Sequence, residues 1–175
     1  MALAERSGNP ASLVRLLHHA GMSSLISSDD MCMILTLADR ALELALREGC
    51  PGSLLFAHSL QVQARFVCGD LGGTEKHFTA EMELANDPTL RRKWSLILVQ
   101  DFGVAGLTAW ILGRPDLARQ RIAEMIAITN ANNHYELAFS RVLTAEFTMN
   151  LREYDQAAAL AGQALELSEK HQFPC

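Results

Sequence analysis

Residues Gln100 to Ile128 read QDFGVAGLTAWILGRPDLARQRIAEMIAI, and this stretch decides the fold class of the chain. Gly113 ends one apolar run, and a glycine just past a helix end adopts a left-handed backbone at little cost. Pro115 suits the first turn of a new helix, where its missing N–H leaves no acceptor without a donor. Asp116 beside it suits the positive end of the helix dipole. The stretch therefore predicts two helices that double back on each other at residues 113–115.

The second of these helices carries a single apolar stripe. Its members recur at i, i+4, i+7, i+8 and i+11, which is the spacing of one helix face. They are Ala118, Ile122, Met125, Ile126 and Thr129. In the first helix, Gly106 stands among bulky residues, although glycine inside a helix costs about 0.5–1 kcal/mol relative to alanine. We therefore expect a partner helix to approach closely at Gly106.

Composition extends the same prediction to the whole chain. Alanine, leucine, glutamate, glutamine and arginine, all good helix formers, dominate the 175 residues, and no long segment alternates polar and apolar side chains. The fold class predicted is all-α. The net charge of −5 and a pI near 5.6 argue against a surface that binds nucleic acid or anionic membrane.

The location expected from sequence is the cytoplasm. The four cysteines show no CxxC spacing, and reduced thiols are the default for a cytoplasmic protein. No basic segment followed by an apolar one opens the chain, and no apolar run approaches the roughly 20 residues that span a bilayer. We therefore expect a soluble protein without a membrane partner.

Breaks in the helical pattern repeat at intervals of roughly 40 residues, which is the mark of a repeat array. They predict about four helical hairpins within one repeat domain over residues 1–175. The hairpins are expected at about 10–48, 52–85, 96–130 and 134–171. Each would bury one face on its neighbour in an α-α superhelix, or solenoid. Residues 86–94, with the basic triplet Arg91-Arg92-Lys93, are expected to form a polar, solvated connection. Both ends resemble interrupted hairpins, so we expect a segment of a longer chain.

The small residues of these hairpins resemble the tetratricopeptide repeat (TPR), although a TPR unit has 34 residues. The motif Gln100-Asp101-x-Gly103-Val104, followed by Ala109-Trp110-x-Leu112-Gly113-x-Pro115-Asp116-x-Ala118, is more specific. It is similar to the C-terminal region of bacterial multi-domain predicted ATPases, which often carry a class III adenylate cyclase domain. Phe102 departs from that family, which usually has proline there. The resemblance implies a regulatory part of a bacterial signalling protein.

Catalytic and cofactor signatures are missing from the sequence. The histidines do not recur at the i, i+3 or i+4 spacing that metal ligands on one helix require. The segment Gly69-Asp70-Leu71-Gly72-Gly73 lacks the Lys-Ser/Thr of a phosphate-binding loop and follows a helix, so it is interpreted as a hairpin turn. We expect no enzyme activity, no metal and no cofactor.

The candidate site is a partner-binding groove. In a TPR array the first helices of successive hairpins line one face, and the resemblance places twelve residues there. They are Phe56, Ser59, Gln63, Phe66, Gln100, Gly103, Leu107, Trp110, Phe139, Val142, Glu146 and Met149. This set is apolar, aromatic and sparsely charged, which suits an amphipathic helix or an apolar extended peptide. Burial of the same stripe in the core is the competing interpretation.

Three functions follow from this sequence. The first is a protein–protein interaction and scaffold module whose partner is a peptide or another domain of the parent chain. The second is a domain that senses a small effector and controls an attached ATPase, cyclase or transcription factor. The third, an enzyme, has no supporting motif. We also expect a homodimer formed through the uncapped ends of the array.

Overall fold

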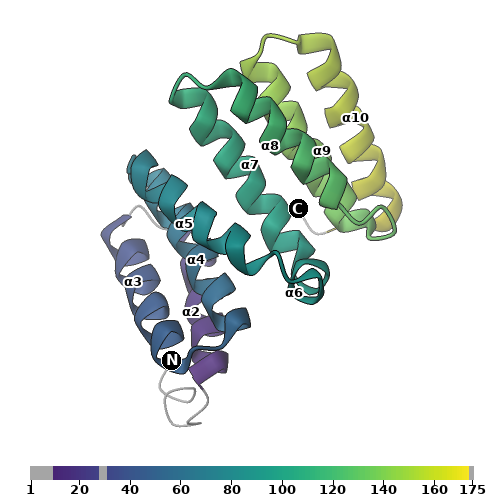
Figure 1. The fold of residues 1–175 in the computed structure, drawn as a ribbon. Helices are drawn as coiled ribbons and strands as arrows, with labels where there is room; N and C mark the ends of the chain where they lie inside the picture. Colours follow the sequence, from purple (N-terminus) through teal and green to yellow (C-terminus); the bar gives the residue numbers. More distant parts are fainter. Residues whose placement is uncertain (1–9, 28–30, 174–175) are drawn as a thin grey trace. The chain divides into compact units, whose positions relative to one another are not determined.

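A computed structural model describes residues 10–27 and 31–173. These residues form helices and no strands (Figure 1), which confirms the all-α class and its consecutive helical hairpins. The helices are α2 (Pro10–Ser27), α3 (Met31–Glu48), α4 (Pro51–Val67), α5 (Leu71–Leu84), α6 (Pro88–Lys93), α7 (Ser95–Ile111), α8 (Pro115–Ile128), α9 (His134–Asn150) and α10 (Tyr154–His171).

The turns that close the α4–α5, α7–α8 and α9–α10 hairpins share one backbone geometry. At the end of α7, Gly113 has φ +72°, its N–H donates to the carbonyl of Trp110, and the next N–H donates to the carbonyl of Ala109. The α4–α5 turn repeats this pattern at Gly69. The α9–α10 turn repeats it at Arg152, which has φ +63° without being a glycine. The sequence predicts a left-handed backbone at a glycine in this position, but nothing in the sequence predicts it at Arg152.

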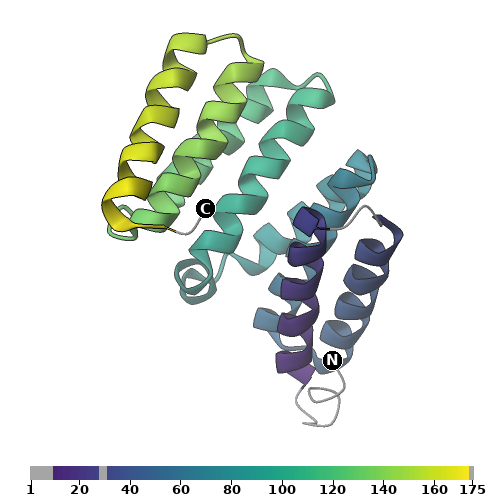
Figure 2. The ribbon, with the colours of Figure 1, turned by 180° about the vertical axis from the view of Figure 1, so that it is seen from behind.

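The chain divides after Lys93 into two compact units. Unit 1 contains the hairpins α2–α3 and α4–α5 together with α6, and unit 2 contains the hairpins α7–α8 and α9–α10. In unit 1, α4 lies against both helices of the preceding hairpin, and in unit 2 α9 does the same. Figures 1 and 2 show the helices of each hairpin side by side. Within each unit the hairpins therefore stack sideways, as in an α-α superhelix. The single domain over 1–175 stays a prediction.

The core of unit 1 joins three helices. Its fully buried large apolar side chains come from α2, α3 and α4. They include Val14, Leu17, Ile34, Leu55, Leu60 and Val62. A polar contact lies among them, because the Nε2 atom of His18 on α2 is 3.2 Å from the Oγ atom of Ser59 on α4. This contact engages one ring nitrogen of His18, whereas the buried Nδ1 atom of the same ring has no hydrogen-bond partner among the described residues.

The core of unit 2 explains Gly106. A Cβ atom at this position would lie 2.8 Å from the Cδ1 atom of Ile122 on α8, closer than real Cβ atoms pack. The close approach expected at Gly106 is therefore present. In the predicted stripe of α8, Ala118, Ile122 and Met125 are buried, but Ile126 is 52% exposed. The part of α8 that its neighbours cover is therefore narrower than the apolar stripe in the sequence.

Two other features differ from or extend the expectations. The polar connection contains the six-residue helix α6, which the sequence analysis did not foresee, with the basic triplet in its last turn and no buried residues. Two features explain why α6 starts here. Pro88 occupies its first position, and the N–H of Arg91 donates to the carbonyl of Asp87 in its first turn. Helix α7 begins at Ser95, well before Phe102, which is buried. The departure from proline at Phe102 thus falls inside a helix, where proline would remove a hydrogen bond.

Candidate functional site

The candidate positions on α4 lie mostly inside unit 1. Phe56 and Ser59 are almost fully buried against α2, where the ring of Phe56 meets the ring of His18 edge to face with centroids 5.1 Å apart. Gln63 is also buried, and Phe66 is half-buried. These side chains offer a partner little surface, with Phe66 the most accessible of them.

The candidate positions on α7 are partly covered. Gln100, Leu107 and Trp110 are half-buried, and the site of a Cβ atom on Gly103 is occupied by the side chain of Leu143 from α9. The ring of Trp110 packs edge to face on the buried Phe147, with centroids 6.4 Å apart. Trp110 therefore contributes to the packing of α7 on α9 as well as to the surface.

The candidate positions on α9 are the most exposed. Val142 and Met149 are 49% and 54% exposed, Glu146 is exposed and Phe139 is half-buried. Tyr135, 45% exposed, stacks on Phe139 with the two rings 3° from parallel. We call Tyr135, Phe139, Val142, Glu146 and Met149 the α9 stripe, since their spacing of i, i+4, i+7, i+11 and i+14 follows one helix face. Sequence reasoning missed Tyr135, which the same spacing would have found.

The structure thus brings some candidates together. Those of α7 and α9 lie on adjacent helices of unit 2, and those of α4 belong to unit 1. The α9 stripe is the part with apolar surface open to solvent. From Tyr135 to Met149 the stripe covers 15 residues and rises about 21 Å along the helix axis, comparable to a bound peptide helix of four turns.

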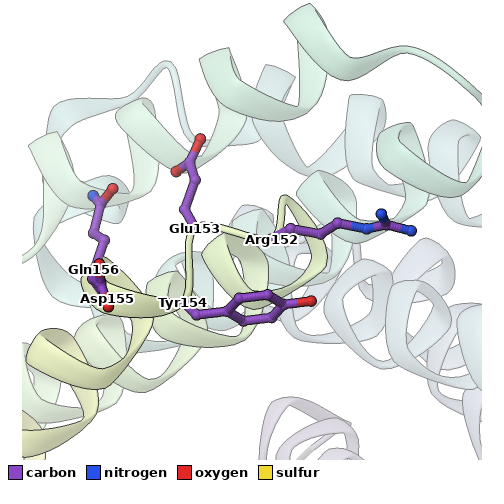
Figure 3. Close-up of a pocket in the computed structure, with 5 residues that line it drawn as sticks. All are labelled: Arg152, Glu153, Tyr154, Asp155 and Gln156. Carbon is purple, nitrogen blue, oxygen red and sulfur yellow. The ribbon is translucent and has the colours of Figure 1, made fainter.

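The turn between α9 and α10 holds a hollow of about 350 Å³. Its walls are five consecutive residues, Arg152 to Gln156, so a single segment of chain forms it. Figure 3 shows the side chains of Arg152 and Tyr154 extending to the same side of the turn, and Glu153 pointing away from them. Most of these side chains are exposed, and an exposed dip at a turn gives a ligand few convergent contacts.

A histidine pair lies between α4 and α5 of unit 1. The Nδ1 atoms of His58 and His77 are 3.0 Å apart. Burial lowers the pKa of both imidazoles, and for His77, where a charge on His58 adds to the effect, the pKa falls to about 4. Burial also lowers the pKa of His18 to about 4. These groups are neutral at physiological pH and act as packing and hydrogen-bonding groups between helices.

A polar network beside this pair ties three helices of unit 1. The amide of Gln61 on α4 donates to the carboxylate of Asp39 on α3 at 2.8 Å and accepts from Arg65 Nε at 2.9 Å. Arg65 also pairs with Asp70, which caps α5 by accepting from the N–H of Gly73. The hydrogen bond from the Gly73 N–H, and after it the one from Arg65, hold the pKa of the Asp70 carboxyl below its usual value. The network fixes the α4–α5 turn at Gly69 and Asp70, and residues 71–73, which the sequence analysis included in the turn, form the start of α5.

Glu136 on α9 links separate elements of unit 2 by hydrogen bonds. The sequence analysis did not single it out. Its side chain is buried, its Oε2 atom accepts from Ser95 Oγ at 2.8 Å, and its Oε1 atom accepts from the backbone N–H of Asn130 at 2.7 Å. It therefore joins the start of α7 to the loop before α9. Both carboxylate oxygens are thus used in hydrogen bonds that hold these elements together.

Within residues 10–27 and 31–173, no three histidine, cysteine or acidic side chains converge so as to hold a metal ion. None of the helices in the same residues combines the length and the apolar character of a bilayer span. No protein-family model, curated protein or solved structure matches this chain. The resemblance to TPR regions of bacterial ATPase and cyclase proteins therefore stays a prediction.

Proposed function

We propose that this chain is a non-catalytic protein-interaction module that binds an apolar or amphipathic segment of a partner protein along the α9 stripe. The observation that carries the proposal is the exposure of Tyr135, Val142 and Met149 on one face of a helix whose opposite side is packed. Solvent-exposed apolar side chains aligned on one face are typical of surfaces that bind other proteins.

The chemistry of the stripe defines the partner. Tyr135 and Phe139 supply aromatic area at one end, and Met149 supplies an adaptable apolar side chain at the other. Glu146 places one carboxylate between Val142 and Met149. An amphipathic helix that carries apolar residues at i, i+4 and i+7 and one lysine or arginine opposite Glu146 would match this order of side chains.

The setting of the proposal comes from the sequence resemblance. A TPR-like regulatory region in a cytoplasmic bacterial signalling protein would bind another domain of the same parent chain, such as its ATPase or cyclase, or a separate protein. Three of the histidines with lowered pKa values, His18, His58 and His77, take part in contacts between helices. Their use in contacts between helices supports a scaffold role for the chain.

Binding by acidic variants of the stripe tests the proposal. Val142→Glu and Met149→Glu place charge on the half-exposed apolar surface, and Leu165→Glu makes the same kind of change on α10, where Leu165 is 59% exposed. A partner captured by the wild-type chain, from the parent's other domains or from a helical peptide library, should lose about tenfold or more in affinity with either α9 variant.

The controls decide the outcome. Leu165→Glu should leave binding unchanged, and circular dichroism should show all three variants folded. Trp110→Ala is less suitable, because the loss of its contact with Phe147 would disturb the packing of α7 on α9. A partner that binds both α9 variants as tightly as the wild type would show that the stripe is not its binding surface.

A further inference from the structure

A second groove lies in unit 2, between α8 and α10. Its first hollow has a volume of about 350 Å³ and its second about 240 Å³. Ile126 of α8 and Thr144 of α9 line both hollows, so the two are continuous. Its floor on α9 includes residues 137, 141, 144 and 148, a different face of the helix from the α9 stripe.

The floor of the groove includes two threonine hydroxyls that already donate to the helix backbone. Ser140, Thr144 and Thr148 are buried. The hydroxyl of Thr144 donates to the Ser140 carbonyl at 2.8 Å, and that of Thr148 reaches the Thr144 and Ala145 carbonyls at 3.0 and 2.9 Å. Because the hydroxyl protons of Thr144 and Thr148 are committed to the helix backbone, these two threonines need no polar partner from a ligand. The floor therefore tolerates an apolar occupant.

Apolar side chains line much of both hollows, although the side of the second hollow towards α10 carries Glu153 and Gln156. Ile126 and Leu160 face the first hollow from α8 and α10, and Ile122, Phe147 and Leu151 line the second. Ile126 is 52% exposed, so apolar area remains open to solvent at the point where the hollows join. An occupant with an alkyl chain would cover this area and gain the free energy of burial.

The two ends of the groove differ in charge. At the end of the second hollow, Arg119 of α8 pairs with Glu153 before α10, with Nη2 and Oε1 3.2 Å apart. At the first hollow, Arg141 of α9 is half-buried and forms no ion pair or hydrogen bond with any other described residue. One end thus carries a neutralised pair and the other an uncompensated guanidinium. A guanidinium beside an apolar wall is suited to a carboxylate, which it can bind with two parallel hydrogen bonds.

We infer that this groove binds a medium-chain alkyl carboxylate. The carboxylate lies on Arg141, and the alkyl chain runs past Ile126 toward Phe147 and Leu151. The axial distance from Arg141 to Thr148 is about 10 Å, from the helix rise per residue, which gives room for an extended chain of this class. The volume of the first hollow falls within the usual range for small-ligand sites. This site is independent of the proposed partner surface on the α9 stripe.

Calorimetric titration of the full chain with octanoate tests the inference. Saturable binding is expected, with butyrate weaker because it cannot reach the second hollow, and with octanol weaker because it lacks the charge that Arg141 recognises. Trp110 supplies an optical readout, since its ring packs on Phe147, which lines the second hollow. Octanoate should therefore change tryptophan fluorescence, and butyrate should not.

Two variants locate the site. Arg141→Gln should weaken octanoate binding about tenfold or more, the usual loss for a charge-assisted hydrogen bond, and should leave octanol binding unchanged. Ile126→Glu, at a half-exposed position, should weaken it through repulsion of the carboxylate. Arg114→Gln removes an exposed arginine of the same unit that lines neither hollow, and should bind like the wild type.

Three results would overturn the inference. They are a wild-type chain without saturable octanoate binding, equal affinity for octanoate and octanol, and unchanged octanoate affinity in both folded variants, Arg141→Gln and Ile126→Glu. Circular dichroism of each variant separates a lost site from a lost fold.

Discussion

The Nδ1 atoms of His58 and His77 lie 3.0 Å apart, so one imidazole donates a proton that the other accepts. This arrangement needs both rings neutral, because a second proton would put two donors face to face. Burial disfavours the charged forms as well and is the largest cause of the lowered pKa of each residue. Charged groups also act on the pair: Lys76 on both rings, Glu83 on His58, and Arg65 and Asp39 on His77.

The histidine pair predicts that the chain loses stability in mild acid. An unfolded histidine has a pKa of 6.5, and folded His77 has a pKa of about 4. Between these two pKa values the unfolded state binds more protons than the folded state. The contribution of His77 to the free energy of unfolding is therefore fully present above pH 6.5 and decreases as the pH is lowered toward 4. Partial solvent access limits the loss from pH 7 to 5 to about 1 kcal/mol for His77. Urea unfolding at the two pH values measures it.

His77→Gln is the variant that isolates the pair. Its stability at pH 7 should be lower than that of the wild type, and its decline toward pH 5 should be shallower. Part of the decline should remain, because buried His18 titrates in the same range with its pKa lowered to about 4. Equal pH slopes for the wild type and His77→Gln would contradict a role for the pair.

The close contact of Gly106 on α7 with Ile122 on α8 predicts that a substitution at Ile122 will compensate for one at Gly106. Gly106→Ala introduces a Cβ atom 2.8 Å from Ile122 Cδ1, and the overpacking should exceed the gain in helix propensity, for a net loss of about 1 kcal/mol. Ile122→Val removes that Cδ1 atom, so Gly106→Ala should become neutral or stabilising in its background. Thermal and urea unfolding of the four chains measure the coupling.

The matched control for Gly106 is Gly162 on α10, where a Cβ atom would meet nothing within 4 Å. Gly162→Ala should stabilise the chain by about 0.5–1 kcal/mol through helix propensity alone. A stabilising Gly106→Ala in the wild-type background would show that Ile122 moves aside without cost.

The positive φ of Arg152 predicts that its replacement by glycine will stabilise the chain. Its φ of +63° is costly for a residue with a Cβ atom, and the turns at Gly69 and Gly113 place glycine at the same step. Arg152→Gly should raise the free energy of unfolding by about 0.5–1 kcal/mol, after allowance for the greater freedom of glycine in the unfolded chain. Arg152→Ala keeps the strained backbone and should bring no gain. Equal effects of the two changes would assign any gain to the lost side chain.

Glu136 predicts a large loss in unit 2. Glu136→Ala leaves the hydroxyl of Ser95 and the N–H of Asn130 without their acceptor and should cost about 2–3 kcal/mol. Glu136→Gln retains one carbonyl acceptor and should cost less. Glu124→Gln, at an exposed position of α8, should change stability by less than about 0.5 kcal/mol. A loss no larger for Glu136→Ala than for Glu124→Gln would contradict the role of Glu136.

The hairpins were predictable because their signals are local. Gly113 and Pro115 mark the end of one helix and the start of the next within three residues, and the spacing of Ala118, Ile122 and Met125 gives the buried side of α8. The short helix α6 was missed because six residues between two breaks leave no periodicity to detect. Arg152 was missed because sequence rules assign its backbone geometry to glycine.

The site was less predictable because exposure depends on distant neighbours. Ser59 and Val142 hold corresponding places in the first helices of their hairpins, yet Ser59 is covered by α2 and Val142 is half exposed. The same limit applies to contacts across long separations: His58 and His77 are 19 residues apart, and Ser95 and Glu136 are 41 apart. No single-sequence pattern links such positions.

The sparse burial of α10 has a consequence for motion. Ala164 is the one buried residue of this helix, whereas ten residues of α4 are buried. Amide protons of α10 should therefore exchange with deuterium sooner than those of α7 or α9, since a segment with few buried contacts opens without unfolding the rest. Because α10 forms one wall of the groove at Leu160, its detachment would admit an occupant from the side, and an occupied groove should slow that exchange.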